Sequence, residues 1–130
     1  MTRILAVDPG DVRIGTAVSD PGRVIATPLS VIQHTSRAAD AERIIEIAQE
    51  HDADTILVGV PYGLEEQPGP QARKAIRLAE EIKAQAEVEV ILWDESGSSK
   101  AAETLHPSHP SIDATAAAVI LQEYLNAQVP

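Results

Sequence analysis

The sequence predicts an α/β fold in which helices flank a mixed five-stranded sheet. In the first quarter of the chain, short apolar runs are separated by turns that contain Pro and Gly, a pattern typical of strands joined as an antiparallel meander. Beyond residue 35, apolar runs alternate with segments whose apolar residues recur every three or four positions, which indicates strands separated by helices. Strands that are connected through helices are expected to run parallel, with right-handed crossovers.

The meander occupies the chain up to residue 32, with strands expected at residues 3–7, 14–19 and 24–32. The turn Asp8-Pro9-Gly10-Asp11 joins the first two strands, because Pro fixes φ and Gly readily adopts a positive φ. Asp20-Pro21-Gly22 joins the second and third strands in the same way. Pro28 has no N–H to donate to a neighbouring strand, so the third strand is expected at an edge of the sheet.

The later elements are expected in alternation: a helix capped by Thr35 or Ser36 and ending near Glu50, a strand over 55–60, a loop over 61–70, a helix over 71–86, a strand over 88–93, a short helix over 98–105 and a last helix over 112–126. The two later strands should lie parallel to the first strand. Neither a repeat nor a low-complexity linker interrupts the chain, so residues 1–130 are interpreted as a single domain.

The composition restricts the classes of function. Ten Lys and Arg residues against twenty Asp and Glu residues give a net charge of -10, which argues against strong non-specific binding of nucleic acid but is compatible with a basic rim around an acidic metal site. The absence of Cys excludes disulfides, thiolate metal sites and a Cys nucleophile. No stretch is long and apolar enough for a membrane span or a signal peptide, so a cytoplasmic location is expected.

Acidic residues stand where three expected elements begin or end: Asp8 after the first strand, Asp94-Glu95 after the fifth, and Asp113 in the first turn of the last helix. Sites in open α/β sheets gather outside the carboxyl ends of the strands, and carboxylate oxygens are ligands that Mg²⁺ accepts. Structural roles remain open as alternatives: a turn cap for Asp8, a solvated strand end for Asp94-Glu95, and a favourable helix-dipole interaction for Asp113. Adjacent strand residues face opposite sides, so only one of Asp94 and Glu95 can serve a common site.

The segment from Ile4 to Asp20 resembles the opening of the YqgF/RuvX family, because it combines a strand with Asp-Pro-Gly, Arg-Ile-Gly and Ser-Asp in the family's order. The segment from Ile56 to Pro61 resembles the family's Val-Gly-Leu-Pro strand and loop. Three later features match in the same order: Gly69-Pro70 before a helix, a strand ending in Asp94-Glu95, and Asp113-Ala114 leading into the last helix. The similarity covers nearly the whole chain.

This resemblance implies an RNase H-like fold, since the family is similar in fold to RNase H and to Holliday junction resolvases. It implies that Asp8, Glu95 and Asp113 are catalytic carboxylates that bind Mg²⁺ or Mn²⁺, with two ions expected. Family members are described both as nucleases that mature the 5′ end of 16S ribosomal RNA and as junction resolvases. The implied function is therefore a metal-dependent endonuclease acting on structured nucleic acid, with pre-16S rRNA processing preferred and resolution of branched DNA as the alternative. The expected assembly is a monomer or homodimer without membrane contact.

Four departures from the family pattern remove phosphate-binding capacity. Ser96-Gly97 replaces the arginine that usually follows the acidic pair, and Ser98-Ser99 replaces a Thr-rich helix start. The Lys/Arg-rich stretch before the last aspartate is reduced to residues 106–112, and the loop at residues 62–67 is unusually acidic. These changes support a further alternative, an RNase H-like module with weakened catalysis that binds a protein partner.

Several basic residues are candidates for contacts with substrate phosphates. Arg13 matches the family's arginine, although a surface ion pair with Asp11 or Asp20 is the alternative. The other candidates are Arg73, Arg77 and Lys100. Arg73 and Arg77 share a helical face near Lys74, and the alternative for them is a solvated face paired with Glu80 and Glu81. His106 and His109 are spaced like zinc ligands, but the adjacent prolines break any helix there, which favours a solvated loop.

Overall fold

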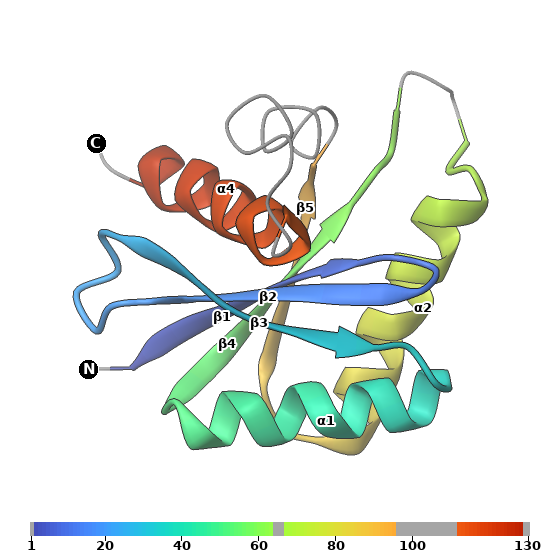
Figure 1. The fold of residues 1–130 in the computed structure, drawn as a ribbon, viewed down its shortest axis with the longest axis horizontal. Coiled ribbons are helices and arrows are strands. Elements are labelled where there is room, and N and C mark those ends of the chain that lie inside the picture. Colours follow the sequence, from blue (N-terminus) through green and yellow to red (C-terminus); the bar gives the residue numbers. More distant parts are fainter. Residues whose placement is uncertain (1, 64–66, 96–111, 129–130) are drawn as a thin grey trace.

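The computed structural model describes residues 2–63, 67–95 and 112–128, with side chains from residue 114 in the last range (Figure 1). Its elements are β1 (Arg3–Pro9), β2 (Arg13–Ser19), β3 (Ala26–Gln33), α1 (Arg37–Glu50), β4 (Ala53–Val60), α2 (Pro70–Gln85), β5 (Glu89–Asp94) and α4 (Ile112–Ala127). Their order confirms the predicted alternation. The short helix expected over residues 98–105 lies outside the described residues.

The strands form one five-stranded sheet in the order β3-β2-β1-β4-β5. β1 pairs antiparallel with β2, and β2 pairs antiparallel with β3, which confirms the predicted meander. β4 runs parallel to β1 and to β5, as expected for strands connected through helices. β3 lies at an edge, where Pro28 can be accommodated beside a register shift in its pairing with β2.

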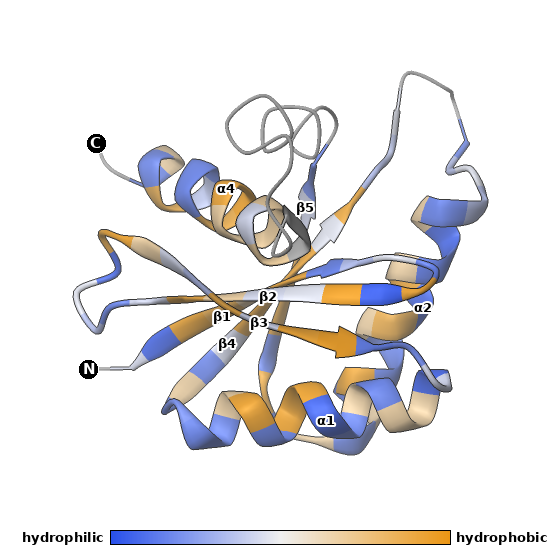
Figure 2. Ribbon diagram, viewed as in Figure 1, coloured by the Kyte–Doolittle hydropathy of each residue, from blue (hydrophilic) through white to orange (hydrophobic). Residues whose placement is uncertain are grey.

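Helices cover both faces of the sheet, α1 and α2 on one face and α4 on the other (Figure 1). Apolar side chains alternate along the central strands to supply both cores. On β1, Leu5 and Val7 pack toward α1 and α2, whereas Ile4 and Ala6 pack toward α4. This two-sided burial explains the uninterrupted apolar runs of β1 (residues 4–7) and β4 (residues 56–58), which lie between more polar strand ends (Figure 2). None of the described helices has the length and apolarity needed to cross a membrane.

Local polar contacts explain where the helices and the third strand begin. The Ser36 hydroxyl accepts the N–H of Ala39, which confirms one of the two predicted caps for α1. Pro70 occupies the first turn of α2, where its missing N–H carries no cost. The third strand begins at Ala26 rather than at the predicted Val24, because an Asp20 carboxylate oxygen accepts the N–H groups of Val24 and Ile25, each at 2.8 Å. These bonds hold the two residues in the turn rather than in the sheet.

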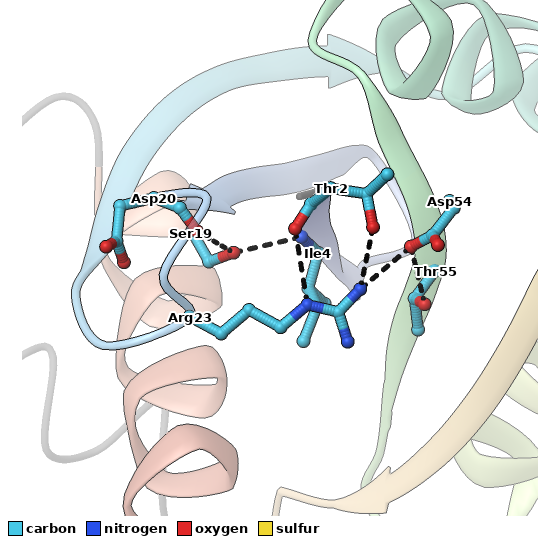
Figure 3. Close-up of polar contacts among 7 residues, drawn as sticks. All are labelled: Thr2, Ile4, Ser19, Asp20, Arg23, Asp54 and Thr55. Carbon is cyan, nitrogen blue, oxygen red and sulfur yellow. Dashed lines mark hydrogen bonds and ion pairs between the residues drawn. The ribbon is translucent and has the colours of Figure 1, made fainter.

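The β2–β3 turn is attached to the amino-terminal ends of β1 and β4 (Figure 3). Arg23, with a positive φ of 58°, donates to the Thr2 hydroxyl at 3.0 Å and to the Asp54 carboxylate at 2.9 Å. The Ser19 hydroxyl accepts the N–H of Ile4 at 2.9 Å. This network lies at the end of β1 opposite Asp8, so it stabilises the sheet without contributing to a site at the strands' carboxyl ends.

Candidate active site

Asp8 and Glu95 come together at the carboxyl ends of β1 and β5, on the face of the sheet that α4 covers. Asp8 continues the alternation of Ile4 and Ala6, which both pack toward α4. Glu95 directly follows β5, and its backbone N–H donates to the carbonyl of Val60 at the end of β4 at 3.1 Å. The strand order β1-β4-β5 therefore brings together two acids that are distant in sequence.

The polar Glu95 side chain is buried, which costs free energy unless hydrogen bonds or an opposite charge compensate for the lost contact with water. Only 7% of the residue is exposed, and its Oε2 atom has no hydrogen-bond partner among the described residues. Burial, followed by a hydrogen bond with Asp8 and by the charges of Asp8 and Asp94, raises the pKa of Glu95 to about 10. Asp94 is exposed, so of the adjacent acids Glu95 is the one that points inward.

Gly59 on β4 provides the space that the Glu95 carboxylate occupies. A Cβ atom at this position would lie 2.8 Å from Glu95 Oε2 and 2.9 Å from Cδ1 of Ile120 on α4. Both separations are shorter than real Cβ contacts, so the Glu95 carboxylate and the end of the fully buried Ile120 side chain would have to shift. The glycine thus permits a close approach between the sheet, α4 and the carboxylate.

Gly59→Ala is expected to displace Glu95 and to lower the melting temperature by roughly 3–10 °C, because overpacking a rigid core costs about 1–3 kcal/mol. It should also reduce any activity that depends on Glu95. Thermal melts and activity assays measure the two effects. Gly69→Ala is the matched control, since a Cβ at Gly69 meets no atom within 4 Å and its φ of -72° suits alanine. Equal effects of the two substitutions would contradict the role of Gly59.

Asp113, the third predicted acid, lies in the first turn of α4, as expected. Its side chain is outside the described part of the structure, so its position relative to Asp8 and Glu95 stays a prediction. Where side chains are described, no group of three or more acidic or His residues could hold a metal ion. The structure therefore brings together two of the three predicted acids.

The Asp8–Glu95 pair fits a divalent cation chemically. Two adjacent carboxylates repel when both are ionised, and the raised pKa of Glu95 reflects its burial first and then its interactions with Asp8, this repulsion among them. The partnerless Oε2 is a hard oxygen donor of the kind that Mg²⁺ and Mn²⁺ prefer. A cation would supply both the missing partner and the opposing charge, while the structural alternative of a simple turn cap for Asp8 leaves Glu95 unexplained.

The predicted phosphate-binding residues lie in different places. Arg13 begins β2, is exposed, and falls on the α4 face two residues from Gly15, which is paired with Asp8. Arg73 and Arg77 are exposed on α2, across the sheet from the carboxylates. Arg73 donates to the carbonyl of Pro68 at 3.0 Å rather than pairing with a glutamate. Lys100, like His106 and His109, lies outside the described residues.

Two contacts between residues that are distant in the chain do not follow from the sequence pattern. Lys74, next to Arg73 in the sequence, forms an ion pair with Asp11 at 2.8 Å on the β1–β2 turn. Gly59, in the segment from Ile56 to Pro61, lies against the Glu95 carboxylate. An isolated glycine within an apolar strand was the available signal, since such a residue often marks a close approach.

Comparison with known proteins identifies the family. Residues 2–127 match the sequence profile of RuvX, described as Holliday junction resolvase. The chain belongs to the RuvX family. A candidate pre-16S rRNA nuclease of Thermoanaerobacter pseudethanolicus is 36% identical over 97% of this chain and 97% of its own length. A protein of the same name from Bordetella bronchiseptica is 39% identical over 95% of this chain and 92% of its own length.

Solved structures confirm the RNase H-like fold expected for a RuvX protein. Thermus thermophilus RuvC, solved with a Holliday junction substrate, has a TM-score of 0.61 and 17% identity, with 98% of this chain and 96% of that chain covered. The fowlpox virus resolvase, solved with Holliday junction DNA, has a TM-score of 0.60 and 8% identity, with 99% and 100% covered. The two resolvase structures therefore resemble this RuvX chain in fold.

Proposed function

We propose that this RuvX protein is a metal-dependent endonuclease that cleaves phosphodiester bonds in structured nucleic acid, with pre-16S ribosomal RNA as its substrate. The observation that carries the proposal is the buried Glu95 carboxyl against Asp8, with an oxygen that lacks a partner. The names of its curated relatives support the choice of a ribosomal RNA precursor. The family description, Holliday junction resolvase, supports branched DNA as the second candidate substrate.

The proposed metal ligands are Asp8, Glu95 and Asp113. Divalent ions bound there, two in the proposal, would supply an activated water and stabilise charge on the scissile phosphate. The rigid sheet holds Asp8 and Glu95 in fixed positions, because each is next to a paired strand end. Arg13, at the edge of the same face, would hold and orient a phosphate of the substrate by charge-assisted hydrogen bonds.

A cleavage assay on three substrates tests the proposal: a 16S rRNA precursor with its 5′ extension, a four-way DNA junction, and plain duplex. Each is incubated with Mn²⁺ and with EDTA. The precursor should be cleaved only with the metal and at least about tenfold faster than the junction, a difference of roughly 1.4 kcal/mol in activation free energy. Faster cleavage of the junction would transfer the substrate assignment to DNA. If none of the three substrates is cleaved, either with Mn²⁺ or with EDTA, the result would favour the alternative function, a protein-binding module, over the nuclease.

The salt dependence of binding should be shallow, because ten basic residues are dispersed among twenty acidic ones. The slope of log affinity against log salt concentration should correspond to fewer than about five phosphates, at about 0.9 per phosphate neutralised. Fluorescence anisotropy of labelled RNA across a salt series measures this slope. A slope that corresponds to about eight phosphates or more would show that the surface presents more positive charge to RNA than the described residues indicate.

A further inference from the structure

A cavity lies across the sheet from the carboxylates, where the β1–β2 turn meets α1 and α2. Its volume is about 270 Å³, close to the lower limit of about 300 Å³ for small-molecule sites, so it accommodates one small ligand. Apolar atoms of Pro9, Ile14 and Leu78 form part of its lining. Charged and polar side chains supply the rest: Asp11, His34, Ser36, Arg37, Asp40 and Lys74.

The two acidic side chains of this cavity are already bound by other protein groups. Asp40 has only 4% of its side chain exposed, and it binds Nδ1 of His34 and the N–H of Thr35. The Nδ1 contact fixes the orientation of the imidazole. Asp11 is bound by the Lys74 ammonium at 2.8 Å and by the Gln71 amide at 2.7 Å, and these two contacts lower the pKa of Asp11. Both acids are therefore occupied by protein groups.

Arg37 differs from the other charged groups of the cavity. It is exposed at the first position of α1, and it forms no hydrogen bond or ion pair with any described residue. The other charged side chains of the cavity, Asp11, His34, Asp40 and Lys74, are each bound by another protein group, so among these described residues Arg37 supplies the unpaired positive charge. An anionic group in the cavity would find a cation that no protein group already binds.

The cavity is also close to the candidate active site along the chain. Pro9 and Gly10, which line it, directly follow Asp8. Two residues span at most about 7 Å, comparable with the length of one or two nucleotides of a strand at about 3.4 Å each. The turn between the two sites is held firmly, because the N–H of His34 donates to the carbonyl of Val12 at 2.9 Å and α2 binds Asp11.

We propose that this cavity is a nucleotide subsite, which receives one nucleotide of the substrate strand that flanks the scissile phosphate. The half-buried Pro9, to which Ile14 and Leu78 add their few exposed atoms, gives the cavity an apolar side that suits a base, and Arg37 suits its phosphate. This assignment rests on the proposed nuclease function. A free mononucleotide carries the same base and phosphate as a nucleotide of the substrate strand, so the experiment distinguishes these two ligands.

The first part of the test measures binding without catalysis. Adenosine 5′-monophosphate is titrated into the ¹⁵N-labelled protein in EDTA, and amide shifts are followed by NMR. Saturable shifts are expected at Gly10, His34 and Leu78, with smaller effects from adenosine or inorganic phosphate alone. Arg37→Gln should weaken binding about tenfold, the loss expected for one charge-assisted hydrogen bond. Shifts centred on Asp8 and Glu95, or no saturable shift, would overturn the subsite.

Arg43→Gln is the matched control, because Arg43 is exposed on the same helix but pairs with Glu46 and Glu50, outside the cavity. It should leave binding of the mononucleotide unchanged, and equal losses in both variants would indicate a general charge effect that contradicts the proposal. Unchanged melting temperatures would verify that both variants are folded.

The second part separates the sources of the nucleotide. If the cavity holds a nucleotide of the substrate strand, Arg37→Gln should raise KM for RNA cleavage about tenfold while kcat stays unchanged, because it removes binding rather than chemistry. An unchanged KM, with mononucleotide binding still localised to the cavity, would assign the cavity to a free nucleotide and overturn the strand assignment. A protein that cleaves RNA but shows no binding in the cavity would refute the subsite and leave the nuclease proposal intact.

Discussion

Replacing Asp8 by Asn is expected to reduce metal-dependent cleavage by at least ~100-fold while leaving the fold intact. The substitution removes one negative charge beside the Glu95 carboxyl but keeps the size of the side chain. Removal of a single group that is preorganised for charge in the transition state typically costs about 10²–10³ in rate. Single-turnover cleavage rates with Mn²⁺ measure the effect, and circular dichroism verifies the fold.

Glu42→Gln is the control for this experiment, because Glu42 is an exposed acid on α1, outside the candidate site. It should retain cleavage close to that of the wild type. Activity of Asp8→Asn within about tenfold of the wild type would contradict the assignment, since a tenfold change corresponds to only about 1.4 kcal/mol of transition-state stabilisation. Asp8 would then be a turn residue, and the nuclease proposal would lose its main support.

The second large effect concerns stability without metal. Glu95→Gln is expected to raise the melting temperature in EDTA at pH 8 by about 5–10 °C, because the amide is neutral without having to keep a proton that the carboxyl loses in the unfolded chain at this pH. Mn²⁺ should stabilise the wild type, by about 2.7 kcal/mol at a hundred times its dissociation constant, and should have little effect on Glu95→Gln. Thermal melts of both proteins in EDTA and in Mn²⁺ test these expectations.

The pH dependence follows from the raised pKa of Glu95. Between the ordinary value of 4.5 and about 10, the folded protein keeps a proton that the unfolded chain has lost. The folded state therefore binds more protons, and its stability falls as pH rises through this window. Glu95→Gln should flatten the fall in EDTA, whereas Glu42→Gln should leave it unchanged. A wild-type curve that is flat between pH 5 and pH 9 (roughly the span in which this linkage operates) would refute the buried carboxyl pair.

The secondary structure could be predicted from the sequence because it depends on neighbours along the chain. The period of the apolar residues separated strands from helices, and the Pro and Gly turns placed the first two connections. The edge position of β3 followed from Pro28, since only its missing N–H had to be considered. The start of β3 could not be read in this way, because side-chain bonds of Asp20 kept Val24 and Ile25 in the turn.

The candidate site depended on more than the sequence pattern. The resemblance named Asp8 and Glu95, but spacing alone left open whether Asp94 or Glu95 faces inward, and the end of β5 beside α4 decided for Glu95. The ion pair between Lys74 and Asp11 likewise joins residues that have no local relationship. Such contacts depend on which elements become neighbours, which short-range patterns do not encode.

By itself the sequence determined the elements, their order and the residues able to carry charge chemistry at the ends of strands. Only the tertiary structure decided which of these residues meet and how they are solvated. Placing β1 beside β4 and β4 beside β5 brought Asp8 to Glu95, and the space at Gly59 allowed α4 to close over the carboxyl. The physical reason is that desolvation and charge repulsion arise from distances in space, whereas apolar periodicity and turn preference act between neighbours in the chain.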